Sequence, residues 1–153
     1  MTIKEFIIAD AMQSFDNFMV TARKVAADKL DWKPLDNGRS TLDQAQEVAL
    51  CPTWVPGLLA SRGFDPALFG GFEEAKAMMT TLDECEAAGR ANLETMKAAI
   101  SGFPDADMDV VIDLPWGKGQ YTLREVMGFP AWNMTYHMGQ VSYIQTLYGD
   151  FSM

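Results

Sequence analysis

Apolar residues recur every three or four positions through four long segments of the chain, which is the spacing of one buried face of an α-helix. Thr2 and Glu5 form a capping box at the start of the first segment, which we expect to run over residues 2–27. Its apolar stripe consists of Ile3, Ile7, Ala11, Phe15, Phe18, Ala22 and Val25. Proline and an Asn-Gly pair between residues 32 and 38 then predict a loop.

The second helical segment begins at Ser40 or Thr41, since either residue can cap a helix. Thr41 and Gln44 would form a second capping box there. Pro52 lies inside the segment and predicts a kink or a split, because proline removes a backbone hydrogen-bond donor. Three glycines and a proline in residues 63–71 predict the loop that follows.

The third segment has a short leader at residues 72–79 and a main helix that opens with a capping box of Thr81 and Glu84. Gly102 ends this helix. The next stretch, residues 104–121, is not helical in pattern. Its alternating apolar residues and Pro-Trp-Gly turn predict a short irregular or extended segment.

The last helix opens with a capping box of Thr122 and Glu125 and should run to Tyr148, where Gly149 stops it. Pro130 inside it predicts a kink. Four amphipathic helices joined by short connections are typical of a bundle. The sequence therefore predicts an all-α fold, an antiparallel four-helix bundle that forms a single domain over residues 1–153.

The charge of the chain limits its partners. Twelve basic and twenty-one acidic residues give a net charge of −9, which argues against binding to nucleic acid or to an anionic membrane surface. No segment is long and apolar enough to span a membrane. The two cysteines, Cys51 and Cys85, fall on separate predicted helices and form no disulfide framework, so we expect a cytoplasmic protein.

Three polar residues interrupt the apolar stripe of the last helix: Asn133, His137 and Gln140. Their spacing of four and three places them on one face, and His137 is the only histidine in the chain. Burying such groups costs a few kcal/mol unless each finds a partner. Either they form a structural network, with Tyr136 or Tyr143 nearby, or they bind a ligand or a metal.

The run WNMTYHMGQ at residues 132–140 resembles the signature of DinB-like proteins. In that family the last helix carries a histidine, three further residues, a second histidine and a Gly-Gln pair. The resemblance extends over nearly the whole chain. It includes the Trp-Lys-Pro loop at 32–34, the Ser/Thr start of the second helix, and the Pro-Trp pair at 115–116 before the Thr122 cap.

The resemblance implies a four-helix bundle that holds a divalent metal on three histidines, one from the second helix and two from the last. It also implies a homodimer. Some relatives resemble thiol-dependent transferases or hydrolases, in which the metal would activate a thiol or a water molecule. A small molecule in the bundle pocket is the partner that this resemblance implies.

The sequence departs from the family pattern at these ligands. His137 matches the second histidine of the last helix, but Asn133 stands at the position of the first. Glu47 best matches the missing histidine of the second helix, although a shift of one residue would place Val48 there, and helical periodicity favours Val48 as the more central position. The expected metal ligands are thus Glu47, Asn133 and His137.

An asparagine oxygen is a poor zinc ligand, so zinc or nickel should bind weakly, and a protein without a metal is the alternative. Cys51 lies one turn after Glu47 and either supplies a thiolate or packs as a small apolar residue. We expect Gln140, Cys51 and Tyr136 to line the pocket. Two functions stay open: a metal-dependent enzyme with an altered ligand set, and a metal-free ligand-binding or interaction protein that has lost catalysis.

Overall fold

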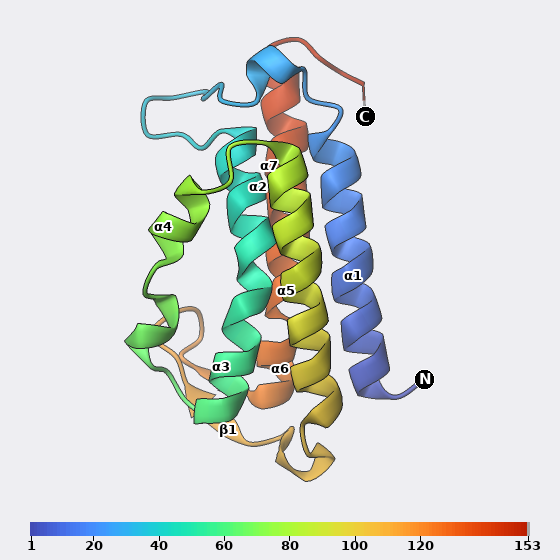
Figure 1. Cartoon of the computed structure of the whole chain (residues 1–153), viewed down its shortest axis with the longest axis vertical. Coiled ribbons are helices and arrows are strands. Elements are labelled where there is room, and N and C mark those ends of the chain that lie inside the picture. Colours follow the sequence, from blue (N-terminus) through green and yellow to red (C-terminus); the bar gives the residue numbers. More distant parts are fainter. Residues whose placement is uncertain (153) are drawn as a thin grey trace.

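The predicted four-helix bundle is confirmed by the computed structural model, which describes residues 1–152 apart from the side chain of Phe69 (Figure 1). Helix makes up 67% of the chain and strand 4%. The long rods of the bundle are α1 (Ile3–Ala22), α2 (Thr41–Leu50) with α3 (Trp54–Ser61), α5 (Leu82–Gly102) and α7 (Phe129–Leu147). In Figure 1, α1 and α7 run towards one end of the bundle, whereas α2, α3 and α5 run towards the other.

Local sequence signals set most of the helix starts. Capping boxes open α1, α5 and the short helix α6 (Leu123–Met127), as predicted. The predicted box of Thr41 and Gln44 is wrong. Ser40 caps α2 instead, because its hydroxyl accepts the backbone N–H of Asp43 at 3.1 Å. The side chain of Gln44 is therefore free of the cap and lies buried in the bundle.

The first helix ends at Ala22, five residues before the predicted end at 27. The chain turns there and forms a 3₁₀ turn, η1 (Ala27–Lys29). Val25 is nevertheless buried. The apolar stripe therefore predicted correctly that Val25 is buried, but it did not predict where the helix ends.

Both internal prolines act on the backbone as predicted. Pro52 lies in a 3₁₀ turn, η2 (Cys51–Thr53), which separates α2 from α3. Gly128 separates α6 from α7, and Pro130 occupies the first turn of α7, where its missing N–H costs nothing. These two breaks lie next to each other in the bundle, since α3 packs against α6.

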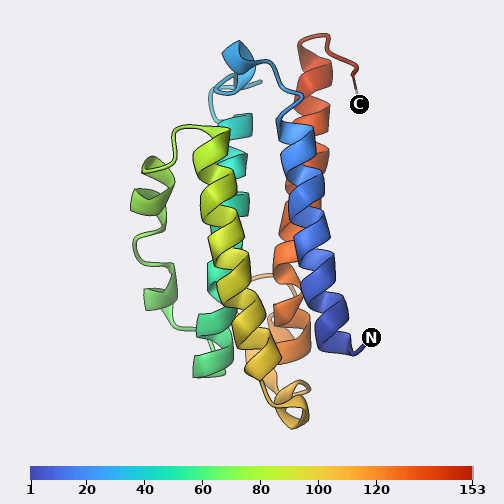
Figure 2. The same ribbon diagram turned by 45° about the vertical axis from the view of Figure 1, so that its right-hand side comes forward.

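Two connections flank the bundle. Residues 62–81, which include η3 (Pro66–Phe69) and α4 (Phe72–Ala77), return along the outside of α2 to the start of α5 (Figures 1 and 2). After η4 (Asp105–Asp107), the strands β1 (Val111–Asp113) and β2 (Gln120–Thr122) pair as an antiparallel hairpin, which is the predicted extended segment. No helix among residues 1–152 is long and apolar enough to cross a membrane.

Helix α5 approaches α1 and α2 closely at Gly89. A Cβ atom at this position would lie 2.3 Å from Cε2 of the buried Phe15 and 3.3 Å from the Cα of Ala49. We expect Gly89→Ala to lower the free energy of unfolding by about 1–2 kcal/mol, because overpacking outweighs the gain in helix propensity.

Urea denaturation measures this loss, and Gly139→Ala in α7 is the matched control. A Cβ at Gly139 would meet open space, so this variant should be up to about 1 kcal/mol more stable than the parent. Equal stabilisation by both substitutions would contradict the close approach at Gly89.

Candidate functional site

Helices α2 and α7 pack side by side and bring together the three predicted metal-ligand candidates. The side-chain amide of Asn133 donates from Nδ2 to Oε1 of Glu47 at 2.9 Å. The same carboxylate oxygen lies 3.0 Å from Nε2 of His137. Glu47, Asn133 and His137 therefore converge, and the hydrogen bonds that join them are made directly between protein atoms.

The imidazole of His137 has oxygen atoms on both sides. Its side chain is 3% exposed, and Nδ1 lies 2.8 Å from Oε1 of Gln140 and 3.1 Å from Oε1 of Gln44. We call Gln44, Glu47, Asn133, His137 and Gln140 the polar cluster. Gln44 was missed from the sequence, because a glutamine in a first helical turn also fits a capping role.

Basic side chains support the cluster from the α2 side. Arg39 donates from Nη1 to Oε2 of Glu47 at 2.6 Å and from Nε to Asp43 at 2.5 Å. Lys76 of α4 donates to the other oxygen of Asp43, also at 2.5 Å. Both oxygens of the Glu47 carboxylate are thus engaged, one by Arg39 and one by α7.

Glu47 is held in its ionised form. Burial would raise the pKa of this carboxyl, but hydrogen bonds from His137 and Asn133 and the charge of Arg39 outweigh burial and lower its pKa from 4.5 to about 2. The folded state therefore binds a proton on Glu47 less readily than the unfolded state.

A lowered pKa of Glu47 makes stability depend on pH. The contribution is present above pH 4.5 and is lost as the pH falls from about 4.5 towards 2, because the unfolded chain takes up the proton first. We expect a loss on the order of 2 kcal/mol over this range. Urea melts at a series of pH values measure it, in high salt so that exposed ion pairs are screened. A Glu47→Gln variant with the same acid dependence as the parent would contradict this assignment.

The other candidate residues lie around the cluster. Val48 is fully buried in the apolar core, as its central position in the periodicity predicted, whereas Glu47 reaches the cluster from the edge of the same helix. Tyr136 is half exposed and stacks on Trp132, with ring centroids 5.3 Å apart. Its edge also contacts the imidazole of His137.

Cys51 is fully buried, and its thiol contacts the carbonyl of Val48 at 3.4 Å. Burial, together with the nearby Glu47 carboxylate, raises its pKa well above the usual value. The side chain is therefore a neutral thiol at physiological pH. The sequence predicted that Cys51, Tyr136 and Gln140 line a pocket. A cavity does lie next to the cluster, but its described lining includes Asn133 and none of these three residues.

A cavity of about 810 Å³, which we call the aromatic pocket, lies beside the cluster where the two helix breaks meet the hairpin. Its described lining residues are Trp54, Trp116, Gly117, Tyr121, Glu125, Gly128, Phe129, Trp132 and Asn133. Gly117 has a positive φ of 60°, and a Cβ there would collide with the Tyr121 hydroxyl, so this wall requires glycine.

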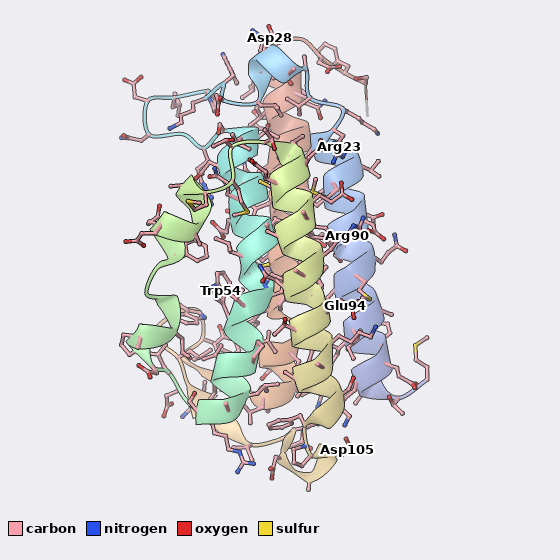
Figure 3. All side chains as sticks on the ribbon, viewed as in Figure 1. Arg23, Asp28, Trp54, Arg90, Glu94 and Asp105 are labelled. Atoms are coloured by element: carbon pink, nitrogen blue, oxygen red, sulfur yellow. The ribbon has the colours of Figure 1, made fainter. Side chains whose placement is uncertain are left out.

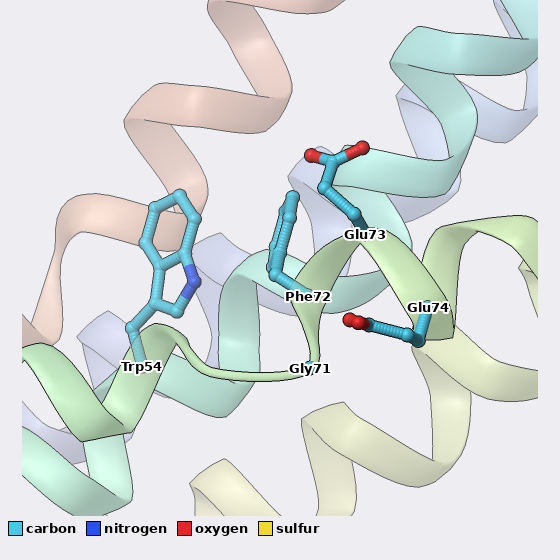
Figure 4. A pocket seen from close by; sticks show the side chains of 5 residues that line it. All are labelled: Trp54, Gly71, Phe72, Glu73 and Glu74. Carbon is cyan, nitrogen blue, oxygen red and sulfur yellow. The ribbon is translucent and has the colours of Figure 1, made fainter.

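Trp54 lines both the aromatic pocket and a second cavity of about 410 Å³. Its indole projects from the bundle beside α4 (Figure 3). The described lining of this outer cavity consists of Trp54, Gly71, Phe72, Glu73 and Glu74 (Figure 4). The rings of Trp54 and Phe72 lie next to each other, with centroids 6.1 Å apart, and the carboxylates of Glu73 and Glu74 on α4 lie beyond the Phe72 ring (Figure 4).

Oδ1 of Asn133, at the aromatic pocket, is buried and has no hydrogen-bond partner within the described chain. The amide orientation follows from the network, because the Glu47 carboxylate can only accept and must therefore face Nδ2. Oδ1 is left as a buried acceptor in a residue that lines the pocket.

The fold is shared with solved bacterial structures. YfiT from Bacillus subtilis, described as "a probable metal-dependent hydrolase with an unusual four-helix bundle topology", superposes with a TM-score of 0.73 and 13% identity, covering 96% of this chain and 88% of that one. A DinB-like protein from the same organism gives a TM-score of 0.62 and 13% identity, covering 93% and 91%. No family model and no curated protein matches the sequence.

The donor atoms do not fit a tightly bound divalent metal. Among residues 1–152, no group of three His, Cys, Asp or Glu side chains is placed to hold a metal ion. A metal at the cluster would compete with two donors for Oε1 of Glu47 and would lie near the Arg39 guanidinium, which repels a cation. Asn133 and His137 add one neutral amide and one nitrogen, a weak set for zinc.

Proposed function

We propose that this DinB-like four-helix bundle binds a small organic molecule in its aromatic pocket, and that the polar cluster holds Asn133 in place for that ligand without a metal. The observation that carries the proposal is the buried, unpartnered Oδ1 of Asn133 in a residue that lines the pocket. A buried acceptor without a partner costs about 1–3 kcal/mol, which a ligand that donates a hydrogen bond would recover.

The shape and lining of the pocket support the same function. A volume of about 810 Å³ lies within the range of small-molecule sites, and an aromatic lining with few polar groups is their usual composition. The polar groups of such sites fix the orientation of the ligand. Asn133 has this role in the proposal, because Glu47 fixes the direction of its amide.

A metal-dependent enzyme is the second candidate. It is favoured by the convergence of Asn133 and His137 within 3.0 Å of Oε1 of Glu47 and by the description of YfiT. Since the donors are already engaged, a metal would be weakly bound, as the sequence predicts. Ligand binding in the presence of a chelator separates the two candidates.

Indole N–H resonances of the ¹⁵N-labelled protein test where a ligand binds. The chain has four tryptophans, of which Trp54, Trp116 and Trp132 line the pocket. Trp32 packs on Tyr148 at the other end of the bundle and is the internal control. Tryptophol, an unlabelled neutral aromatic alcohol, should shift the three pocket resonances in EDTA and leave Trp32 unchanged. Uniform shifts of all four resonances, or none, would overturn the proposal.

For the homodimer we propose the exposed face of α7 as the contact between two copies. The 19 residues of α7 include no Asp, Glu, Lys or Arg, and Trp132, Tyr136, Tyr143 and Leu147 are exposed on it. In a chain of net charge −9, an uncharged helix is where two copies repel each other least.

Sedimentation equilibrium tests this contact. Tyr143→Glu should shift the protein towards monomer, whereas Val20→Glu, at an equally exposed position on α1, should not. A parent protein that stays monomeric at high concentration would end the dimer proposal.

A further inference from the structure

The charged residues described in the lining of the two cavities are all acidic. Of the described residues that line the aromatic pocket, Glu125 is the charged one, and Glu73 and Glu74 line the outer cavity (Figure 4). No described lysine or arginine lines either cavity, and the chain as a whole carries a net charge of −9. Low-dielectric walls with acidic groups at the rim attract cations and repel anions.

The aromatic lining favours the same kind of ligand. Trp54, Trp116, Tyr121, Phe129 and Trp132 supply five of the nine described lining residues. The faces of such rings carry partial negative charge and hold organic cations, with tryptophan the best of them.

A cation from the protein itself already occupies the rim. Nζ of Lys118 lies 5.0 Å from the centroid of the Tyr121 ring and 2.5 Å from Oε1 of Glu125. Both partners of this ammonium group line the aromatic pocket. Lys118 is more than half exposed on the hairpin turn, so its ammonium group can move into solvent at little cost.

We propose that the ligand of the aromatic pocket is an organic cation, a molecule with an aromatic or apolar body and a protonated amine. The amine takes the place of the Lys118 ammonium between Glu125 and Tyr121, and the body fills the pocket towards Asn133, whose Oδ1 accepts a hydrogen bond from a donor on it. The inference rests on the proposed ligand-binding function and adds the charge of the ligand.

Three probes that share one indole ring test the charge. They are tryptamine, which is cationic at neutral pH, the neutral tryptophol and the anionic indole-3-acetate. Calorimetric titration in EDTA should give tryptamine a dissociation constant at least about tenfold below that of tryptophol, with indole-3-acetate the weakest.

Variants of Glu125 and Lys118 at the rim of the aromatic pocket test where the amine of the ligand binds. Glu125→Gln removes the charge and keeps the capping box, since glutamine also serves at that position, so it should weaken tryptamine about fivefold and tryptophol by clearly less. Lys118→Gln removes the internal competitor and should tighten tryptamine severalfold. Lys97→Gln on α5 changes the net charge equally at an exposed residue that is not among the described lining of either cavity, and should have no effect.

The outcomes separate the two proposals. Tryptophol binding as tightly as tryptamine would overturn the cationic ligand and leave the pocket function intact. The cationic-ligand proposal would also be overturned if Lys118→Gln bound tryptamine more weakly than the parent, or if Lys97→Gln gained as much affinity for tryptamine as Lys118→Gln. In either case the amine would not bind at this rim. If none of the three probes binds, the pocket function itself fails.

Discussion

Replacing His137 by leucine is expected to lower the free energy of unfolding by about 3 kcal/mol, nearly as much as replacing it by alanine. Leucine fills the volume of the imidazole but leaves Gln44 and Gln140 without their partner and removes a hydrogen bond from the buried side of Glu47. Alanine leaves the same groups unpartnered and opens a cavity in addition. The hydrogen bonds, and not the packing, should therefore dominate both losses.

Denaturant melts with and without chelator measure these losses. Met134→Leu is the matched control, because it changes a fully buried neighbour on α7 at nearly constant volume and should cost less than about 1.5 kcal/mol. A His137→Leu variant as stable as the parent would show that the fold does not need the imidazole. A ligand or metal role would then be the better explanation of His137.

Asn133→His is expected to create a zinc site. It places a second imidazole four residues before His137 on α7, opposite the Glu47 carboxylate, and so replaces a neutral amide by a nitrogen ligand. Zinc affinity should rise by at least about tenfold over the parent, measured by competition with a chromophoric chelator.

Asn133→Leu controls for the loss of the amide and should not gain affinity. If Asn133→His binds zinc no better than the parent, the three positions do not converge on a metal in solution. Asn133→His should also lose affinity for the pocket ligand, because the Oδ1 acceptor is gone.

Much of the fold could be predicted because its signals are local. Three capping boxes, the apolar stripes and the proline at 52 each act within one or two turns, and the structure follows them. The end of the first helix could not be predicted in this way. Val25 continues the apolar stripe after α1 has ended, since a buried residue in a turn has the same pattern as one in a helix.

The polar cluster was only partly visible in the sequence. The spacing on the last helix pointed to Asn133 and His137, which lie one above the other on α7. Periodicity favoured Val48 over Glu47, because it reports which Cα faces the core. A long glutamate side chain can nevertheless reach the site from beside the stripe.

The end of the last helix was less well predicted. Gln140, the last of the three polar residues on the predicted face, is only partly buried, and Leu147 at the end of α7 is exposed. Towards the end of α7 the buried face passes through Val141, Ile144 and Gln145 instead. A fixed alternation of three and four residues does not follow this change of face.

The aromatic pocket could not be predicted at all. Its walls come from the start of α3, the hairpin and the break between α6 and α7, which are more than 60 residues apart at the extremes. Single aromatic residues such as Trp54 and Trp116 carry no signal of their own in a sequence, because most aromatic residues pack in cores. Their proximity is a product of the two helix breaks meeting the hairpin.

The most direct test of a metal-free ligand site is the dissociation constant of tryptophol, measured by calorimetry after exhaustive chelation and again with zinc added. Protein atoms alone hold Asn133 in place in this account, so the two constants should agree, and Asn133→Leu should weaken binding by at least about tenfold. Binding that disappears on chelation and returns with zinc would contradict the account.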